Sequence, residues 1–130
     1  MAGKIQLLVS AVNQDAAALA EQMNICTDAV IVNQCDRYGY EEIMLRGHRI
    51  QVFSMAERGV GLSRNTALLH ADAQICVFSD EDIVLQPDYA EQVGRAYDAL
   101  PDADMILFNV QVAPARRTYW NEDIHRINYR

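Results

Sequence analysis

Five short apolar runs recur along the chain, and they constrain its fold more than any other feature. Each has about four to six residues, mostly Ile, Val, Leu or Phe: Ile5–Val9, Ala29–Val32, Ile50–Phe53, Ile75–Phe78 and Met105–Val110. Runs of this length with little polar alternation are typical of strands that are buried on both faces, as in a parallel sheet. The runs therefore predict a mainly parallel sheet of about five strands.

Helical patterns separate these runs. Asp15–Met23 is rich in alanine, Leu62–Ala71 carries a ragged apolar stripe, and Pro87–Leu100 keeps one apolar face after a proline at the favoured first helical position. Arg37–Gly47 is polar and has no clear period, which favours a loop or a short helix. Strands that alternate with helices indicate an α/β domain. The length of 130 residues fits one such domain.

The charge of the chain argues against one class of partner. The formal net charge is −7, and nucleic acid is bound mainly through Lys and Arg that meet its phosphates. A small anionic ligand is compatible with this charge, because a bound cation can reverse the local field. The sequence shows no secretory leader, no apolar stretch near ~20 residues, and no disulfide or zinc pattern among its cysteines. We therefore expect a cytoplasmic protein without a transmembrane segment, peripheral to the membrane in a longer form.

The composition changes near the end of the chain. Pro114 interrupts the last apolar run, and arginines then lie close to aromatic residues: Arg116, Arg117, Arg126 and Arg130 beside Tyr119, Trp120 and Tyr129. We divide the chain into a domain, residues 1–112, and a basic, aromatic segment, residues 113–130. A mobile tail, an edge element and the stump of a longer chain are the alternatives for this segment, and we favour the stump.

Ligands of open α/β sheets bind outside the carboxyl ends of the strands, where the sharpest signal here is Asp80-Glu81-Asp82, directly after an apolar run. In extended geometry Asp80 and Asp82 point the same way. Carboxylate oxygens suit Mg²⁺ or Mn²⁺, which carboxylates commonly share with substrate phosphates. A solvated acidic turn before the helix at Pro87 would explain the same residues, so spacing alone leaves both interpretations open.

A loop with two glycines precedes the second predicted helix. Ser63 is a candidate cap for this helix, and free N–H groups at such a start can receive phosphate. Arg64 in the first turn opposes the helix dipole, which suggests an anionic ligand. The alternative is an ordinary loop in which Arg64 pairs with a neighbouring carboxylate.

Three amides lie at predicted strand ends. Asn13 follows the first strand, and Asn33 and Gln34 follow the second. Their paired donor and acceptor groups could bind the edge of a nucleobase. Taken singly, each is typical of a turn.

Together these residues resemble family 2 of the glycosyltransferases, which have the GT-A fold. That family carries G-x-S-x-A-R-N before a helix, and the chain has Gly59 and then Ser63-Arg64-Asn65. The family also carries F-x-D-x-D shortly before P-D-Y. Phe78-Ser79-Asp80-Glu81-Asp82 and Pro87-Asp88-Tyr89 match both the residues and the register, and the resemblance covers about residues 4 to 110.

The resemblance implies an inverting glycosyltransferase, with a GT-A nucleotide-sugar-binding domain over residues 1–112. It would transfer a sugar from a metal-bound nucleotide-diphosphate sugar, UDP-linked by preference, to the hydroxyl of a saccharide or other acceptor. The implied cofactor is Mn²⁺ or Mg²⁺. Asp82 would lie nearest the metal and Asp80 nearer the ribose or sugar. Arg64 would lie near the nucleotide, and Ala11 and Asn13 would line the pocket for base and ribose.

The chain departs from the family's pattern in two places. Asn33-Gln34 stands where the family usually has two aspartates, one of which meets the uracil N–H. An amide oxygen can accept that hydrogen bond, but the identity of the base is left open. The acceptor site and the general base are expected beyond Arg130, so residues 113–130 would be the stump of that half and no catalytic residue is assigned.

Three other functions compete with this interpretation. The first is a non-catalytic module or fragment that only binds a nucleotide. The second is a nucleotidyltransferase, which usually needs a glycine-rich, basic loop after the first strand. Ser10–Asp15 contains neither glycine nor a basic residue. The third is an interaction domain without a ligand, in which the acidic triplet is only a solvated turn.

Overall fold

Five strands form one sheet in the computed structural model, which describes residues 4–111 and 123–127. The strands are β1 (Ile5–Val12), β2 (Asp28–Gln34), β3 (Gly39–Leu45), β4 (His48–Met55) and β5 (Ile75–Asp80). Their spatial order is β3-β4-β2-β1-β5, and all neighbours are parallel except the antiparallel pair β3–β4. The prediction of an α/β domain with a mainly parallel sheet is confirmed.

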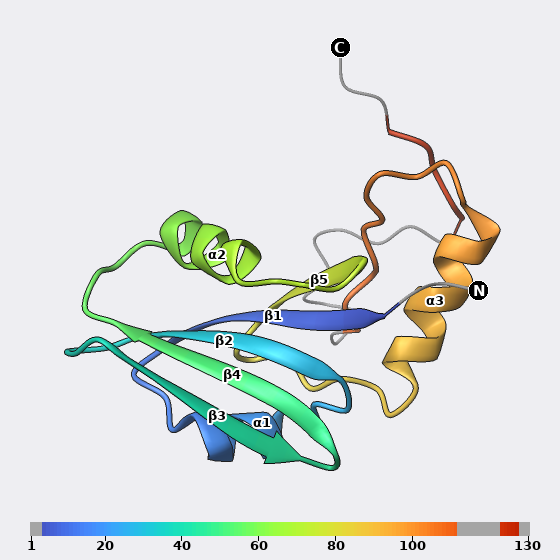
Figure 1. Cartoon of the computed structure of the whole chain (residues 1–130). Coiled ribbons are helices and arrows are strands. Elements are labelled where there is room, and N and C mark those ends of the chain that lie inside the picture. Colours follow the sequence, from blue (N-terminus) through green and yellow to red (C-terminus); the bar gives the residue numbers. More distant parts are fainter. Residues whose placement is uncertain (1–3, 112–122, 128–130) are drawn as a thin grey trace.

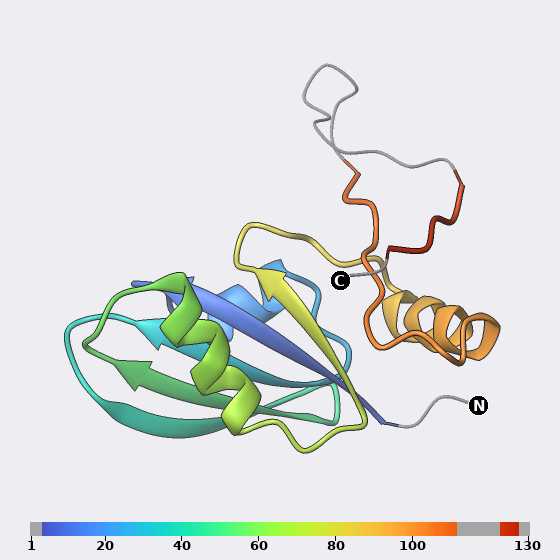
Figure 2. The same cartoon turned by 90° about the horizontal axis from the view of Figure 1, so that it is seen from above.

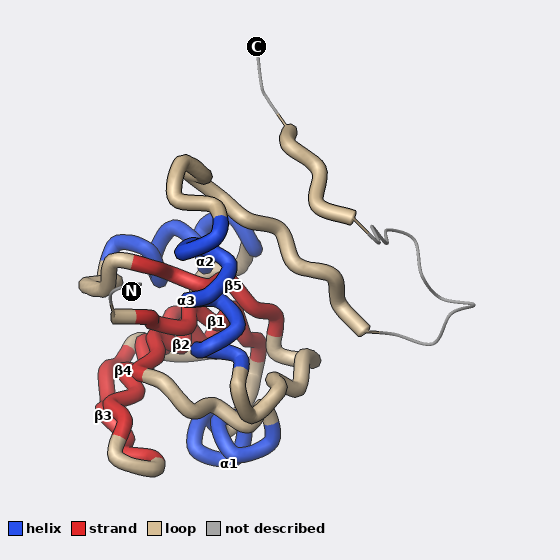
Figure 3. The backbone as a smooth tube through the Cα atoms, turned by 90° about the vertical axis from the view of Figure 1, so that its right-hand side faces the viewer, coloured by secondary structure: helices blue, strands red, loops and turns tan. Residues whose placement is uncertain are grey.

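The helices in these described ranges are α1 (Ala16–Gln22), α2 (Val60–Leu69) and α3 (Tyr89–Ala99). α1 and α2 cover opposite faces of the sheet (Figure 1), and the side view shows the same three layers (Figure 3). Each face has its own buried cluster. Alternate residues of β1 divide between them: Leu7 and Val9 belong to the cluster with α1, and Leu8 to the cluster with α2.

The prediction of a loop or short helix over Arg37–Gly47 was wrong, because most of this stretch forms β3. β3 and β4 make a hairpin in which Leu45 pairs with His48 across a two-residue turn. Both turn residues have positive φ, 51° at Arg46 and 80° at Gly47, as a type I′ hairpin turn requires. The first half of β3 is exposed on both faces. A strand of this kind shows no hydrophobic period in its sequence.

The strand predicted over Met105–Val110 is also absent, since residues 105–111 carry no regular secondary structure in the described chain. Figure 2 shows this stretch, in orange, lying outside the sheet. It returns past the loop before α3, where Gln86 Nε2 donates to Gln111 Oε1 at 3.5 Å. β5 is consequently an edge strand, and its Phe78 side chain is 46% exposed. Burial on both faces thus holds for β1 and β2 but not for β5.

The starts of two helices differ from those predicted. Gly59, with φ of 133°, is the N-cap of α2, so Ser63 lies inside the helix and is not its cap. Arg64 therefore lies beyond the first turn, where it opposes the helix dipole less than expected. α3 begins at Tyr89, so Pro87 precedes the helix instead of occupying its first position.

Two features concern the whole chain. In the part that the structure describes, no helix has the length and apolar character needed to cross a membrane. Apart from residues 123–127, the basic, aromatic segment predicted from residue 113 on lies outside the described residues. The division at residue 112 stays a prediction.

Candidate functional site

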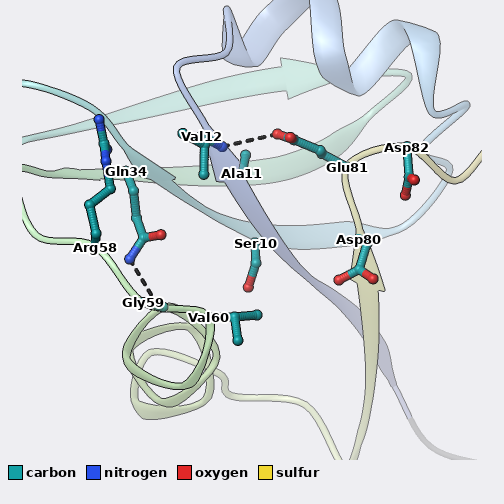
Figure 4. A pocket seen from close by; sticks show the side chains of 10 residues that line it. All are labelled: Ser10, Ala11, Val12, Gln34, Arg58, Gly59, Val60, Asp80, Glu81 and Asp82. Atoms are coloured by element: carbon teal, nitrogen blue, oxygen red, sulfur yellow. Dashed lines mark hydrogen bonds between the residues drawn. The ribbon is translucent and has the colours of Figure 1, made fainter.

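A pocket of about 460 Å³ lies at the carboxyl ends of β1, β2 and β5 and at the start of α2. Figure 4 shows the side chains that line it: Ser10, Ala11, Val12, Gln34, Arg58, Gly59, Val60, Asp80, Glu81 and Asp82. These residues come from four separate parts of the sequence. The edge of the sheet at which they meet is the one where ligands of open α/β sheets bind.

The acidic triplet enters this pocket through a turn. β5 pairs with β1 as far as Ser10↔Asp80. The chain then turns, with the Ile83 amide donating to the Asp80 carbonyl at 3.3 Å. The expectation that Asp80 and Asp82 point the same way in an extended strand was wrong, because β5 ends at Asp80. The turn nevertheless places both side chains on the same pocket.

The three carboxylates have different surroundings. Asp80 Oδ1 forms an ion pair with an Arg64 guanidinium nitrogen at 3.2 Å. Glu81 Oε2 accepts a hydrogen bond of 2.9 Å from the Val12 amide. Asp82 is exposed and makes no hydrogen bond or ion pair with residues 4–111 or 123–127. In this part of the chain Asp82 is the member of the triplet whose oxygens are all available to a ligand.

Gln34 presents an acceptor to the same pocket. Its side chain is 3% exposed, and its Nε2 donates to the Gly59 carbonyl at 2.9 Å. A carbonyl oxygen can only accept a hydrogen bond, so this contact fixes which end of the amide faces Gly59. The amide oxygen is thereby turned toward the pocket, as Figure 4 shows.

Asn33 has a different role from its neighbour. Its Oδ1 accepts from the Gln14 amide at 3.1 Å, and its Nδ2 donates to the Gln14 carbonyl at 2.7 Å. Asn13, with φ of 51°, lies with it at a second hollow on the α1 side of the sheet. Adjacent strand residues point to opposite faces, so the structure separates Asn13 and Asn33 from Gln34 instead of bringing them together.

Arg64 does not line the pocket, but it reaches it indirectly through its ion pair with Asp80. This contact is the neighbouring-carboxylate pairing that the sequence left as an alternative. The side chains are 47% and 56% exposed for Arg64 and Asp80. Both are therefore accessible to a ligand that would compete for either.

Several pocket residues were not assigned from the sequence: Ser10, Val12, Arg58, Gly59, Val60 and Glu81. Ser10 and Val12 share the face of Gln34, and the period of two along β1 could have found them. Arg58 belongs to the polar stretch after the third predicted strand, but no role was assigned to it. It lies in the loop after β4 and donates to the Cys35 carbonyl at 3.2 Å, a contact that depends on two loops meeting in the folded chain.

No group of three or more His, Cys, Asp or Glu side chains that could hold a metal ion occurs within the described ranges. The pocket contributes carboxylates from Asp80, Glu81 and Asp82, with the Glu81 oxygen engaged by Val12. Oxygen donors of this kind suit hard divalent cations, which one or two carboxylates can bind together with substrate phosphates. The donor set is therefore chemically compatible with Mg²⁺ or Mn²⁺.

Comparison with known proteins gives one match. The profile of the family described as "Glycosyl transferase family 2" matches residues 9–130. No curated protein and no solved structure shows a significant match to the chain. The matched region includes every residue that lines the pocket. It spans nearly all of the sequence, and the chain therefore belongs to glycosyl transferase family 2.

Proposed function

We propose that this chain binds a nucleotide-diphosphate sugar, UDP-linked by preference, in the pocket at the ends of β1, β2 and β5. It would transfer the sugar to the hydroxyl of a saccharide or other acceptor, with inversion of the anomeric carbon and with Mn²⁺ or Mg²⁺ as cofactor. Family membership supports the glycosyl transfer. The chemistry of the pocket supports the site of donor binding and the metal.

The observation that carries this proposal is that the three carboxylates of the acidic triplet differ in their protein contacts. Asp80 and Glu81 each have a protein partner, whereas Asp82 has none in the described chain. We assign Asp82 as the principal ligand of the cation and Asp80 as the second carboxylate. When bound, the cation would neutralise charge on the departing diphosphate.

The other pocket residues would position the nucleotide. Gln34 has its amide nitrogen fixed on Gly59, so its oxygen can accept a hydrogen bond from an imino N–H such as that of uracil. Arg64 contributes a positive charge next to Asp80 and could move onto the nucleotide. The acceptor hydroxyl would lose its proton to a general base as its oxygen attacks the anomeric carbon. The cytoplasmic location expected from the sequence is part of this proposal.

Calorimetry would test donor binding. UDP, GDP and dTDP are titrated into the full chain with and without Mn²⁺, and the titrations are repeated with Asp82→Ala. We expect UDP to bind in the presence of Mn²⁺ and Asp82→Ala to weaken this binding by about tenfold or more. Asp102→Ala is the matched control. It removes the same charge from an exposed residue outside the pocket.

Two results would contradict the proposal. The first is the absence of binding by all three nucleotides, and the second is binding that responds neither to Mn²⁺ nor to Asp82→Ala. A separate assay distinguishes an enzyme from a binding module: UDP release from a UDP-sugar is measured with simple saccharide acceptors. If the chain binds the UDP-sugar tightly but releases no UDP with any of the acceptors, the result would favour a module that only binds the donor.

A further inference from the structure

The side chain of Glu81 bridges two strands that lie far apart in the sequence. Its Oε2 accepts the Val12 amide hydrogen at 2.9 Å across 69 sequence positions. The Asn13 amide donates to Gln34 on the β2 side of β1. Successive amides of a strand point to opposite sides, so the Val12 amide points to the side on which β5 runs.

β5 cannot supply a backbone partner for that amide. The ladder between β1 and β5 ends at Ser10↔Asp80, and the chain turns away at Asp80–Ile83. The Glu81 carboxylate takes the place of the next backbone carbonyl in the ladder. The acidic turn is thereby attached to the end of β1 at a point between its two flanking aspartates (Figure 4).

We propose that Glu81 is a positioning residue of the donor site. By accepting the Val12 amide it fixes the turn against β1 and so sets the placement of Asp80 and Asp82 relative to each other and to the pocket. This inference rests on the proposed function, which supplies the cation that Asp80 and Asp82 would bind. Glu81 acts through its hydrogen bond, and its charge is not required.

Substitutions at Glu81 separate the hydrogen bond from the charge. Glu81→Gln keeps an acceptor oxygen at the same distance from the backbone but removes the charge. Glu81→Asp keeps the charge on a side chain that is one methylene shorter and does not reach Val12 in the same way. Glu81→Ala removes both. Positioning by the hydrogen bond predicts that Glu81→Gln resembles the wild type and that the other two variants resemble each other.

The experiment has two readouts on the full chain. Hydrogen exchange of the Val12 amide, followed by NMR without ligand, reports the contact itself. Calorimetric titration of Mn²⁺ in the presence of UDP reports the metal site. For Glu81→Ala and Glu81→Asp we expect faster Val12 exchange and a Mn²⁺ affinity reduced about tenfold or more, as for other residues that orient metal ligands. Glu81→Gln should leave both quantities near the wild-type values.

Other outcomes would overturn the inference. A Glu81→Gln variant as weak for Mn²⁺ as Glu81→Ala would show that the charge matters, and unchanged Mn²⁺ affinity in Glu81→Ala would show that the contact does not position the site. If circular dichroism shows that Glu81→Ala does not fold, equal Mn²⁺ affinities of Glu81→Asp and Glu81→Gln would overturn the inference.

A wild type that binds neither Mn²⁺ nor UDP would refute the proposed function, and the positioning role with it. If the wild type binds Mn²⁺ and UDP and the Glu81 variants have the same Mn²⁺ affinity, only the positioning role of Glu81 is refuted.

Discussion

At the scale of single residues, the adjacent amides at the end of β2 use their polar atoms differently. Asn33 uses both of its polar atoms on the backbone of Gln14. Gln34 uses its nitrogen on Gly59 and leaves its oxygen to the pocket. This division explains how an amide can stand where the family usually has a carboxylate. The nitrogen anchors the loop before α2, which a carboxylate could not do.

Replacing Gln34 with glutamate should destabilise the fold. The side chain keeps its length but loses the N–H that the Gly59 carbonyl accepts, and a nearly buried carboxylate then faces a carbonyl oxygen. We expect Gln34→Glu to lower the free energy of unfolding by about 1–3 kcal/mol at neutral pH. Urea denaturation would measure the change. Gln74→Glu, at an exposed loop position, should change stability by no more than about 0.5 kcal/mol, and equal effects of the two substitutions would contradict the argument.

At the scale of elements, the ion pair between Arg64 and Asp80 connects α2 to the end of β5. The same Asp80 carboxylate is proposed to help bind the cation. Arg64 and a metal ion would then compete for it. A nucleotide phosphate could remove this competition by giving Arg64 another anion to contact. Metal and nucleotide should consequently bind better together than either does alone.

The substitution Arg64→Gln should separate the competition between Arg64 and the metal from the contact between Arg64 and the nucleotide. Without the guanidinium, Mn²⁺ alone should bind more tightly by roughly two- to fivefold, the range that an exposed ion pair of up to about 1 kcal/mol permits. The UDP affinity in the presence of Mn²⁺ should fall, because the positive charge near the nucleotide is lost. Electron paramagnetic resonance of free Mn²⁺ and calorimetry would measure the two affinities.

The matched control for this prediction is Arg95→Gln. Arg95 lies on α3 in a longer ion pair with Asp88, at 4.0 Å, and its side chain is more exposed than that of Arg64. Its removal changes the net charge equally and should leave both affinities at wild-type values. A gain in Mn²⁺ affinity of the same size in both variants would show that overall charge, and not competition for Asp80, is responsible.

At the scale of the whole molecule, strands buried on both faces could be predicted from the sequence, whereas a strand held mainly by pairing with its neighbour could not. β1 and β2 are covered by helices on both faces, and this burial is visible as continuous apolar runs. β3 is held by its hairpin with β4 and has no apolar period, so it was not foreseen. Met105–Val110 has the composition of a strand but carries no regular secondary structure in the described chain. An apolar composition by itself therefore does not decide whether a segment becomes a strand.

The same distinction applies to the pocket. Gln34, Asp80 and Asp82 were predicted because they lie at strand ends, and the topology brings strand ends together. Ala11 was predicted from the resemblance to the family. The contact between Glu81 and Val12 depends on where one strand leaves the ladder, which no spacing in the sequence reveals. The sequence thus predicted the edge of the sheet at which the pocket lies, while the partner of each carboxylate required the structure.

The pocket joins β1, β2, β5 and α2, so a ligand held there should stabilise the whole fold. A ligand that binds only the folded state adds about 2.7 kcal/mol of stability at a free concentration of 100 times its Kd. For a chain of this size that corresponds to a rise in Tm of roughly 10 °C. We expect UDP with Mn²⁺ to produce this shift in differential scanning calorimetry, and uridine, which lacks the diphosphate, to produce a smaller shift that does not depend on Mn²⁺. Asp82→Ala should abolish the difference between UDP with and without metal. If uridine raised Tm by the same amount, and only with Mn²⁺, the diphosphate would not be needed to bind the cation. The cation site proposed between the acidic turn and the diphosphate would then be wrong.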